Sequence, residues 1–324
     1  MKKQIVSIGL LLTALCPPST TVAQASFPAK PIRLVVPFPP GGANDEIARP
    51  ISQALTESLK QSVFIDNKGG AGGIIGSQAV ARAAADGYSL LFISAGHAIN
   101  PSLYDLPYDS LRDFEPVILV GEGAYVLVAT PTLPANSVTE LVALAHKEPA
   151  KLSFASAGIG NATHLAGELF KKQTNINIFH VPYKGGGPAL VDVAGGQVSM
   201  YFSSTIAAAP FLKERRVKPI AVTSKHRSAT LPDVPTVAES GFPDYEVTAW
   251  WAVLAPRGTP DHIVRKLNDE INRALRLPAV RKPLQAQGIE PKGGTSAAAA
   301  SFIAQEIEKW RAVVASAGIS KAQP

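Results

Sequence analysis

The order of strands and helices along the chain is the feature that most restricts its fold. Short β-branched runs alternate with helical patterns, and glycine-rich loops join them. The first part of the chain predicts strands at 32–36, 63–66 and 89–94 and helices at 44–60 and 74–84. Such alternation predicts a parallel sheet covered by helices, because each helix carries the chain back to start the next parallel strand.

The same alternation restarts near residue 125 and forms a second unit. The expected strands are 125–129, 151–155, 178–181, 198–202, 220–223 and 247–254, and the expected helices are 137–147, 161–173, 188–194, 259–275 and 296–315. This second unit is too short to hold the last two helices as well. We therefore predict that residues 26–124 and 250–324 form lobe 1 and that residues 125–249 form lobe 2, with crossings near 121–127 and 246–252.

The amino terminus has the pattern of a secretory signal. Met1-Lys2-Lys3 precedes an apolar run at 5–15, and an Ala-x-Ala sequence ends at Ala25. We predict cleavage after Ala25 and export to the periplasm. Cys16, the single cysteine, leaves open a lipid-anchored alternative, although Leu15 before it is larger than the small residue usual at such sites. Without the signal no thiol or disulfide remains.

Composition and motifs argue against several classes of protein. The net charge of +6 is spread along the chain, and the densest basic cluster, at 213–218, lacks the interleaved aromatic residues of a nucleic-acid site. The glycine loop at 69–73 lacks the Lys-Ser/Thr ending of a phosphate loop and the frame of a dinucleotide site, so we predict no cofactor. No metal spacing and no catalytic motif is evident, and the histidines are scattered singly.

Two glycine loops are candidates for binding an anion. The loop at 37–45 and the loop at 156–164 each lie between the end of a strand and the start of a helix. Ligands bind at this edge of parallel sheets, and the first N–H groups of a helix attract negative charge. We expect the two loops to face each other and to hold a dianion. The alternatives are rigid turns without a ligand and, for Asp45, a residue that only complements the helix dipole.

Two further features have a functional and a structural interpretation. His164 could contact a ligand or act as a base, although a single histidine in the first turns of a helix is more often structural. Tyr183 and Lys184 follow the strand at 178–181 and could close the mouth of the site, but an ordinary surface loop is an equal alternative.

Six ordered motifs give the chain a family resemblance. They are PFPPGGANDEIAR, GGAGGIIGSQAVARAAADGYSLL, ASAGIGNATHL, VPYKGGGPAL, PDVPTVAESGFP and WWAVLAPRGTPDHIV. Together they resemble the Bug-type, TctC-like extracytoplasmic solute receptors of tripartite tricarboxylate transporters. The resemblance covers the whole chain after the signal.

The resemblance implies a fold and a function. It implies an α/β, two-lobed periplasmic-binding-protein (Venus flytrap) fold, with a mixed or parallel sheet flanked by helices in each lobe and two crossing strands. It implies a monomeric, non-catalytic receptor that binds a small carboxylate (a di- or tricarboxylate, an aromatic acid or an acidic amino acid) and delivers it to the transporter's membrane subunits. A ligand-sensing subunit for a membrane kinase and a periplasmic enzyme are the alternatives.

The resemblance also points to ligand-binding residues. In lobe 1 they are Phe38, Pro40, Gly41, Gly42 and Asp45, with Ser94 and His97 as side-wall residues. In lobe 2 they are Ser156, Gly158, Gly160, Asn161, Thr163 and His164, with Ser203 and Ser204 as side-wall residues. Tyr183 joins the predicted ligand-binding residues from its own position after the strand at 178–181 and not from the resemblance. Backbone donors do not distinguish one carboxylate from another, so side chains around the site must determine which acid is bound.

Overall fold

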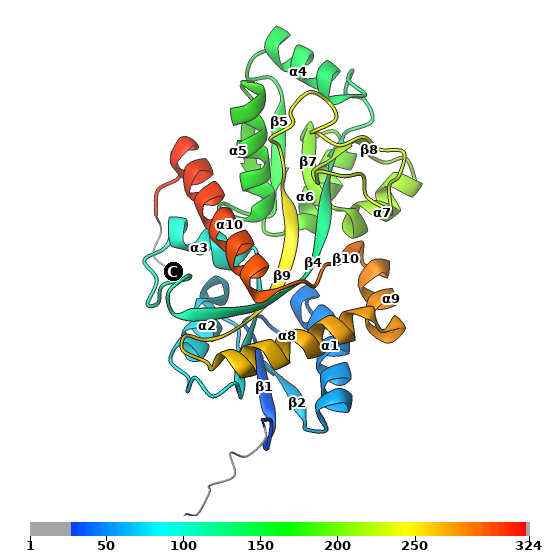
Figure 1. Cartoon of the computed structure of the whole chain (residues 1–324). Coiled ribbons are helices and arrows are strands. Elements are labelled where there is room, and N and C mark those ends of the chain that lie inside the picture. Colours follow the sequence, from blue (N-terminus) through cyan, green and yellow to red (C-terminus); the bar gives the residue numbers. More distant parts are fainter. Residues whose placement is uncertain (1–26, 322–324) are drawn as a thin grey trace, which may run out of the picture.

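In the computed structural model, which describes residues 27–321, one long strand runs through both lobes. Strand β4 (Phe114–Ala129) pairs along its first part with the antiparallel strand β9 (Thr248–Pro256). Its second part pairs with β7 (Met200–Ser204) and β8 (Lys218–Val222), also antiparallel. Figure 1 shows β4 and β9 side by side where they pass from the lower lobe into the upper lobe.

Lobe 1 is built on a mixed sheet. Its strands run in the order β2-β1-β3-β9-β4, with β10 added on β4. The elements not yet given are β1 (Ile32–Val36), β2 (Val63–Asn67), β3 (Ser89–Ser94) and β10 (Ile289–Pro291), with helices α1 (Ala43–Leu59), η1 (Ala71–Gly73), α2 (Ile74–Ala81), α3 (Gly96–Leu103), α8 (Asp261–Arg276), α9 (Pro278–Ala286) and α10 (Ser296–Ser316). β1 is parallel to both β2 and β3, whereas β9 is antiparallel to β3.

Lobe 2 repeats this plan on the far part of β4. Its sheet joins β4, β7, β5 (Ser153–Ser156) and β6 (Phe179–Pro182), with β5 parallel to both β6 and β7. Its helices are α4 (Val138–Lys147), α5 (Ala162–Thr174), α6 (Gly186–Ala194) and α7 (Thr205–Lys213). The predicted lobe boundaries at residues 124/125 and 249/250 fall inside the continuous strands β4 and β9, and they stay a prediction.

Local sequence explains why these elements form where they do. Four of the five residues of β1 are buried apolar side chains, three of them consecutive, as expected for a strand covered on both faces. The predicted capping box begins α4, since the Ser137 hydroxyl accepts a hydrogen bond from Glu140 N–H at 3.2 Å. Pro50, which could have bent α1, lies within a helix that continues to Leu59.

The sequence-based prediction missed three helices for a common reason. Helices α3, α7 and α9 contain Pro101, Pro210 and Pro283 in their interiors. Proline removes a helix hydrogen bond and usually ends a helix, so a sequence pattern interrupted by proline reads as a loop. The first half of β4 and the short strand β10 were also not predicted. β4 contains Pro116, where its pairing with β9 shifts register.

Helix α10 connects the two lobes on one side of the molecule. It packs against α3 and β4 and also against α5 of lobe 2, and Figure 1 shows it in red along this side. Within residues 27–321, no helix combines the length and the apolar character required to cross a bilayer. The signal predicted at residues 1–25, with Cys16 and the cleavage site after Ala25, lies outside the described residues.

Candidate functional site

A cavity of about 550 Å³ lies where the two predicted loops meet. Its lobe 1 wall comes from the loop after β1, the start of α3, and β9, and its lobe 2 wall is the loop after β5. The lining residues are Phe38, Ala43, Asn44, Gly72, Ser94, Ala95, Gly96, Ile99, Asn100, Leu103, Tyr104, Tyr125, Ala157, Gly158, Ile159, Gly160, Asn161, Ala162, Ala249, Trp250 and Trp251. The two loops therefore share one hollow, as predicted.

The lobe 1 loop is held from behind by a buried carboxylate. Asp45, only 1% exposed, accepts hydrogen bonds from Gly41 N–H at 2.9 Å and from Asn67 Nδ2 at 3.0 Å, and it also pairs with Arg49. Burial alone would raise the pKa of Asp45, but these hydrogen bonds and the nearby guanidinium together lower it. Asp45 is thus a charged anchor for the loop, and the Gly41 amide is already occupied.

Two helices of lobe 1 begin at the cavity with uncapped amides. The N-cap of α1 is Gly42, which has no side chain to accept a hydrogen bond. The N–H groups of Ala43 and Asn44 therefore have no acceptor within the helix. The N-cap of α3, Ala95, likewise provides no side-chain cap. Since Ala43, Asn44, Ala95 and Gly96 all line the cavity, two partial positive charges face it.

The lobe 2 loop is fixed mainly by its own side chains. Ser156 Oγ accepts from Gly158 N–H at 3.1 Å, and Thr163 Oγ1 accepts from Ala157 N–H at 2.9 Å. Asn161, the N-cap of α5, accepts from Thr163 N–H at 3.0 Å. Fewer amides of this loop are free than the sequence suggested. Ala162, the first residue of α5, keeps an N–H without a helical acceptor, and it lines the cavity.

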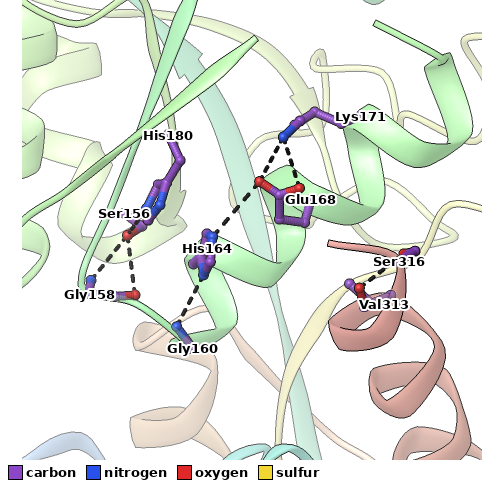
Figure 2. A network of polar contacts seen from close by, with 9 residues as sticks. All are labelled: Ser156, Gly158, Gly160, His164, Glu168, Lys171, His180, Val313 and Ser316. Carbon is purple, nitrogen blue, oxygen red and sulfur yellow. Dashed lines mark hydrogen bonds and ion pairs between the residues drawn. The ribbon is translucent and has the colours of Figure 1, made fainter. Parts of the chain in front are cut away.

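A stack of aromatic rings lies against the lobe 2 loop, and Figure 2 shows two of its members, His164 and His180, beside Gly160 and Ser156. The rings of His164 and His180 lie 3.8 Å apart, and His180 also stacks on Phe154. His164 Nδ1 accepts a hydrogen bond from Gly160 N–H at 3.1 Å, and His180 Nε2 is 2.6 Å from Ser156 Oγ. His164 Nε2 also lies 3.8 Å from Glu168 Oε1 on α5, whereas the contacts with Gly160 and Ser156 hold the loop.

Both imidazoles of the stack are held neutral. Burial is the main cause that lowers the pKa of His164 to about 4, followed by the neighbouring His180 and Lys171. Burial and Lys171 lower the pKa of His180 to about 4 as well. A neutral His164 is required for its contact with Gly160, because the Nδ1 atom must accept.

The two lobes touch across the cavity at Gly160. This glycine has φ +74°, and a Cβ atom there would lie 2.5 Å from Leu103 Cδ1 on α3 of lobe 1. Glycine is therefore required both by the backbone conformation and by the close approach of Leu103. On the lobe 1 side, Trp251 Nε1 donates to Asn44 Oδ1 at 2.6 Å and so ties β9 to the start of α1.

The structure divides the predicted site residues into three groups. Those that line the cavity are Phe38, Ser94, Gly158, Gly160 and Asn161. Those that lie in or behind the two loops without lining it are Pro40, Gly41, Gly42, Asp45, His97, Ser156, Thr163 and His164. The third group also does not line the cavity. Tyr183 has its backbone beside the lobe 2 loop, where its N–H donates to Ser156 O at 3.0 Å, but its hydroxyl donates to Asp192 at 2.6 Å, and Ser203 and Ser204 are the last residues of β7 and not a loop after it. Ligand contact by any of them stays a prediction.

His97 lies beneath the cavity floor and not in its wall. It is 5% exposed, and its Nε2 lies 2.9 Å from the carbonyl oxygen of Ser110, so Nε2 is the donor. Burial lowers its pKa to about 4. Its Nδ1 has no hydrogen-bond partner among the described residues, and it borders a small cavity of about 10 Å³ that shares Phe38 and Ser94 with the larger one. This space is too small for a carboxylate.

Several lining residues were not predicted. Asn44 and Ile159 belong to the quoted loop motifs, and Trp250 and Trp251 begin the last motif. Their position in these motifs was a sequence signal that could have identified them. Tyr104 follows the unpredicted helix α3 and had no such signal. Tyr125 was assigned to a strand, but only the pairing of β4 with β9 brings it to the cavity.

A second hollow, of about 590 Å³, lies beside β10 and the loop after β8. Its walls include charged pairs such as Lys292 and Glu122, whose side chains are 2.8 Å apart. None of the predicted ligand residues lines it. Within residues 27–321, no cluster of three or more histidine, cysteine or acidic side chains could hold a metal ion.

Comparison with known proteins identifies the family. Residues 47–319 match the family model described as the tripartite tricarboxylate transporter family receptor, TctC. The chain belongs to this receptor family. It is 39% identical to protein BugT of Bordetella pertussis, over 98% of each chain. The family is one of extracytoplasmic solute-binding receptors.

Two solved structures of relatives have the same fold. Rpa4515 of R. palustris, solved with adipate, is 37% identical, with a TM-score of 0.75 over 91% of this chain and 100% of the other. MatC of Rhodopseudomonas palustris, solved with bound malate, is 34% identical, with a TM-score of 0.70 over 89% of this chain and 100% of the other. The predicted two-lobed periplasmic-binding-protein fold is confirmed.

Proposed function

We propose that this chain is a periplasmic receptor that captures a small carboxylate in the cavity between its lobes and delivers it to the membrane subunits of a tripartite tricarboxylate transporter. The observation that carries the proposal is the cavity itself, where the starts of α1, α3 and α5 converge. Its volume of about 550 Å³ is within the usual range for small-molecule sites. Relatives solved with adipate and with malate support a carboxylate as the ligand.

Three helix starts suit an anion because their N–H groups carry partial positive charge. In lobe 1 the first N–H groups of α1 and α3 have no side-chain cap, and in lobe 2 the N–H group of Ala162 also has no partner within its helix. A carboxylate bridging the two sets would favour the closed arrangement, since only this arrangement offers both. Release to the transporter then requires the lobes to separate.

Proline substitutions at the first helical residue test this directly. Proline is favoured at this position, where its missing N–H has no helical partner. Ala43→Pro and Ala162→Pro each follow an extended residue (Gly42 with ψ 168° and Asn161 with ψ 154°), so both helices should remain intact. Each variant removes one donor from the cavity. We expect each to weaken binding of dicarboxylates about tenfold or more in calorimetry.

Ser296→Pro is the matched control, because Ser296 is the first residue of α10 after the extended Thr295 and does not line the cavity. All three variants should unfold at the temperature of the unchanged protein when no ligand is added. Full affinity in both Ala43→Pro and Ala162→Pro would contradict the proposed site.

For the export part of the proposal, mass spectrometry of the secreted protein should show loss of residues 1–25, and a retained, lipid-modified Cys16 would contradict it.

A further inference from the structure

We infer that the acid bound in this cavity has at most two carboxylates and an apolar carbon body, and that Ile159 recognises this body. The inference rests on the proposed function and specifies its ligand. None of the described residues that line the cavity is an aspartate, glutamate, lysine, arginine or histidine. The charge of a ligand must therefore be balanced by backbone and dipoles alone.

The helix starts set an upper limit on that charge. A helix N-terminus acts as roughly half a positive charge, so α1, α3 and α5 together supply about +1.5. This balances one or two carboxylates. A third carboxylate would be buried with no opposite charge beside it, which is unfavourable because a buried charge requires a partner.

Each side-chain amide of the cavity has one of its two polar atoms engaged within the protein. Asn44 Oδ1 accepts from Trp251, and Asn100 Nδ2 donates to the carbonyl oxygen of Gly72 at 3.1 Å. Asn161 Oδ1 accepts from the N–H and the hydroxyl of Thr163. The polar groups left to meet a ligand are the other atom of each amide and the hydroxyls of Ser94, Tyr104 and Tyr125, which suffice for the two carboxylate ends of a diacid.

Much of the remaining wall is apolar. The large apolar side chains that line it are Phe38, Ile99, Leu103, Ile159, Trp250 and Trp251. A ligand hydroxyl placed against these groups would lose its hydrogen bonds to water without replacement, and a hydrocarbon body would not. Where the ligand body lies against this apolar part of the wall, hydroxylated acids are disfavoured.

Ile159 is the part of this wall that a ligand body can still cover. Its exposure is 68%, whereas the other large exposed apolar side chains in the described chain range from 41% to 51%. It lies at the tip of the lobe 2 loop between Gly158 and Gly160, whose positive φ angles of 137° and 74° shape the loop around it. Covering an exposed isoleucine with a hydrocarbon body removes apolar surface from water and so strengthens binding.

Matched pairs of acids test the inference by calorimetry. Succinate and malate differ by one hydroxyl, adipate and mucate differ by four, and glutarate and tricarballylate differ by one carboxylate; benzoate adds an aromatic body. In each pair that binds, the dissociation constant of the unsubstituted acid should be about tenfold lower, or lower still, than that of the substituted acid. Tighter binding of malate, mucate or tricarballylate would overturn the inference. If no acid binds, the proposed function itself fails, so the two failures are distinguishable.

Ile159→Ser tests the role of that side chain. The variant should bind the preferred unsubstituted acid about tenfold more weakly, because the gain from covering isoleucine is lost. Its affinity for the hydroxylated acid of the same pair should change little. The ratio of the two affinities should therefore become smaller. Ile206→Ser is the control, since Ile206 is 46% exposed on α7 and does not line the cavity. An unchanged preference in Ile159→Ser would overturn the assignment of Ile159.

Discussion

Individual side chains in this protein act mostly by fixing backbone. Asp45, Ser156 and Thr163 each accept hydrogen bonds from the amides of a loop and do not line the cavity themselves. The residues of the same loops that line the cavity are mostly small or apolar neighbours, with Asn44 and Asn161 as the exceptions. A short loop can present amides to a guest only if other groups hold its shape, because a loose loop would lose conformational entropy on binding.

Asp45→Ala should show the cost of losing such an anchor. The substitution leaves the Gly41 amide and the Asn67 side chain without their buried acceptor, so we expect a loss of about 2 kcal/mol or more in the free energy of unfolding. Ligand affinity should fall with it. Urea denaturation and calorimetry measure the two effects. Glu46→Ala, at the next and exposed position, should change neither; equal effects of the two variants would contradict the anchor role.

At the scale of elements, α10 is attached to the crossing strand β9 through one buried carboxylate. Glu306 is 5% exposed and accepts from Trp250 Nε1 at 2.8 Å and from Trp310 Nε1 at 3.0 Å, and Lys309 pairs with it. Since α10 also contacts α3 and α5, this junction connects the crossing strands with helices of both lobes. Trp250 lines the cavity as well.

Glu306→Ala should therefore destabilise the protein strongly. It removes the shared acceptor of two buried indole N–H groups, and each unpaired group costs about 1 to 3 kcal/mol. We expect the free energy of unfolding to fall by about 3 kcal/mol. Tryptophan fluorescence recorded during denaturation measures this loss. Glu308→Ala, which removes an exposed carboxylate two residues away on the same helix, is the control. A loss no larger than that of Glu308→Ala would contradict the role of this junction.

At the scale of the whole molecule, both lobes contain histidines that the fold holds neutral. His97 lies in lobe 1 and His164 and His180 lie in lobe 2, and the pKa of each falls from 6.5 to about 4 on folding, chiefly through burial. Between these two pH values the unfolded chain binds protons that the folded protein does not. Stability therefore falls as the pH drops from 6.5 to 4 and is fully retained above 6.5.

Denaturation curves at pH 7 and pH 4.5 test this expectation. The free energy of unfolding should be lower at pH 4.5, with a contribution on the order of 3 kcal/mol from His97 once the pH is below 4. His164→Asn, whose amide oxygen can still accept from Gly160, should make this decrease smaller. His146→Asn, at an exposed position on α4, should leave it unchanged. A decrease of the same size in His164→Asn would exclude a contribution from the imidazole stack.

The sequence alone determined the class of fold and the position of the two glycine loops. Strand–helix alternation and glycines at strand ends are local signals, and they depend on backbone conformation and on periodic burial. The same signals failed where proline interrupts a helix, as in α3, and where β4 continues past Pro116.

Only the tertiary structure decided which side chains form the cavity. Asn44, Tyr104, Tyr125, Ile159 and Trp251 are far apart in the chain and meet because β4 and β9 cross between the lobes. It also decided which amides remain available, since partners such as Asp45 and Ser156 are recognisable as acceptors only once the loops are folded around them. Contacts between distant segments depend on packing of the whole chain, and no local pattern encodes them.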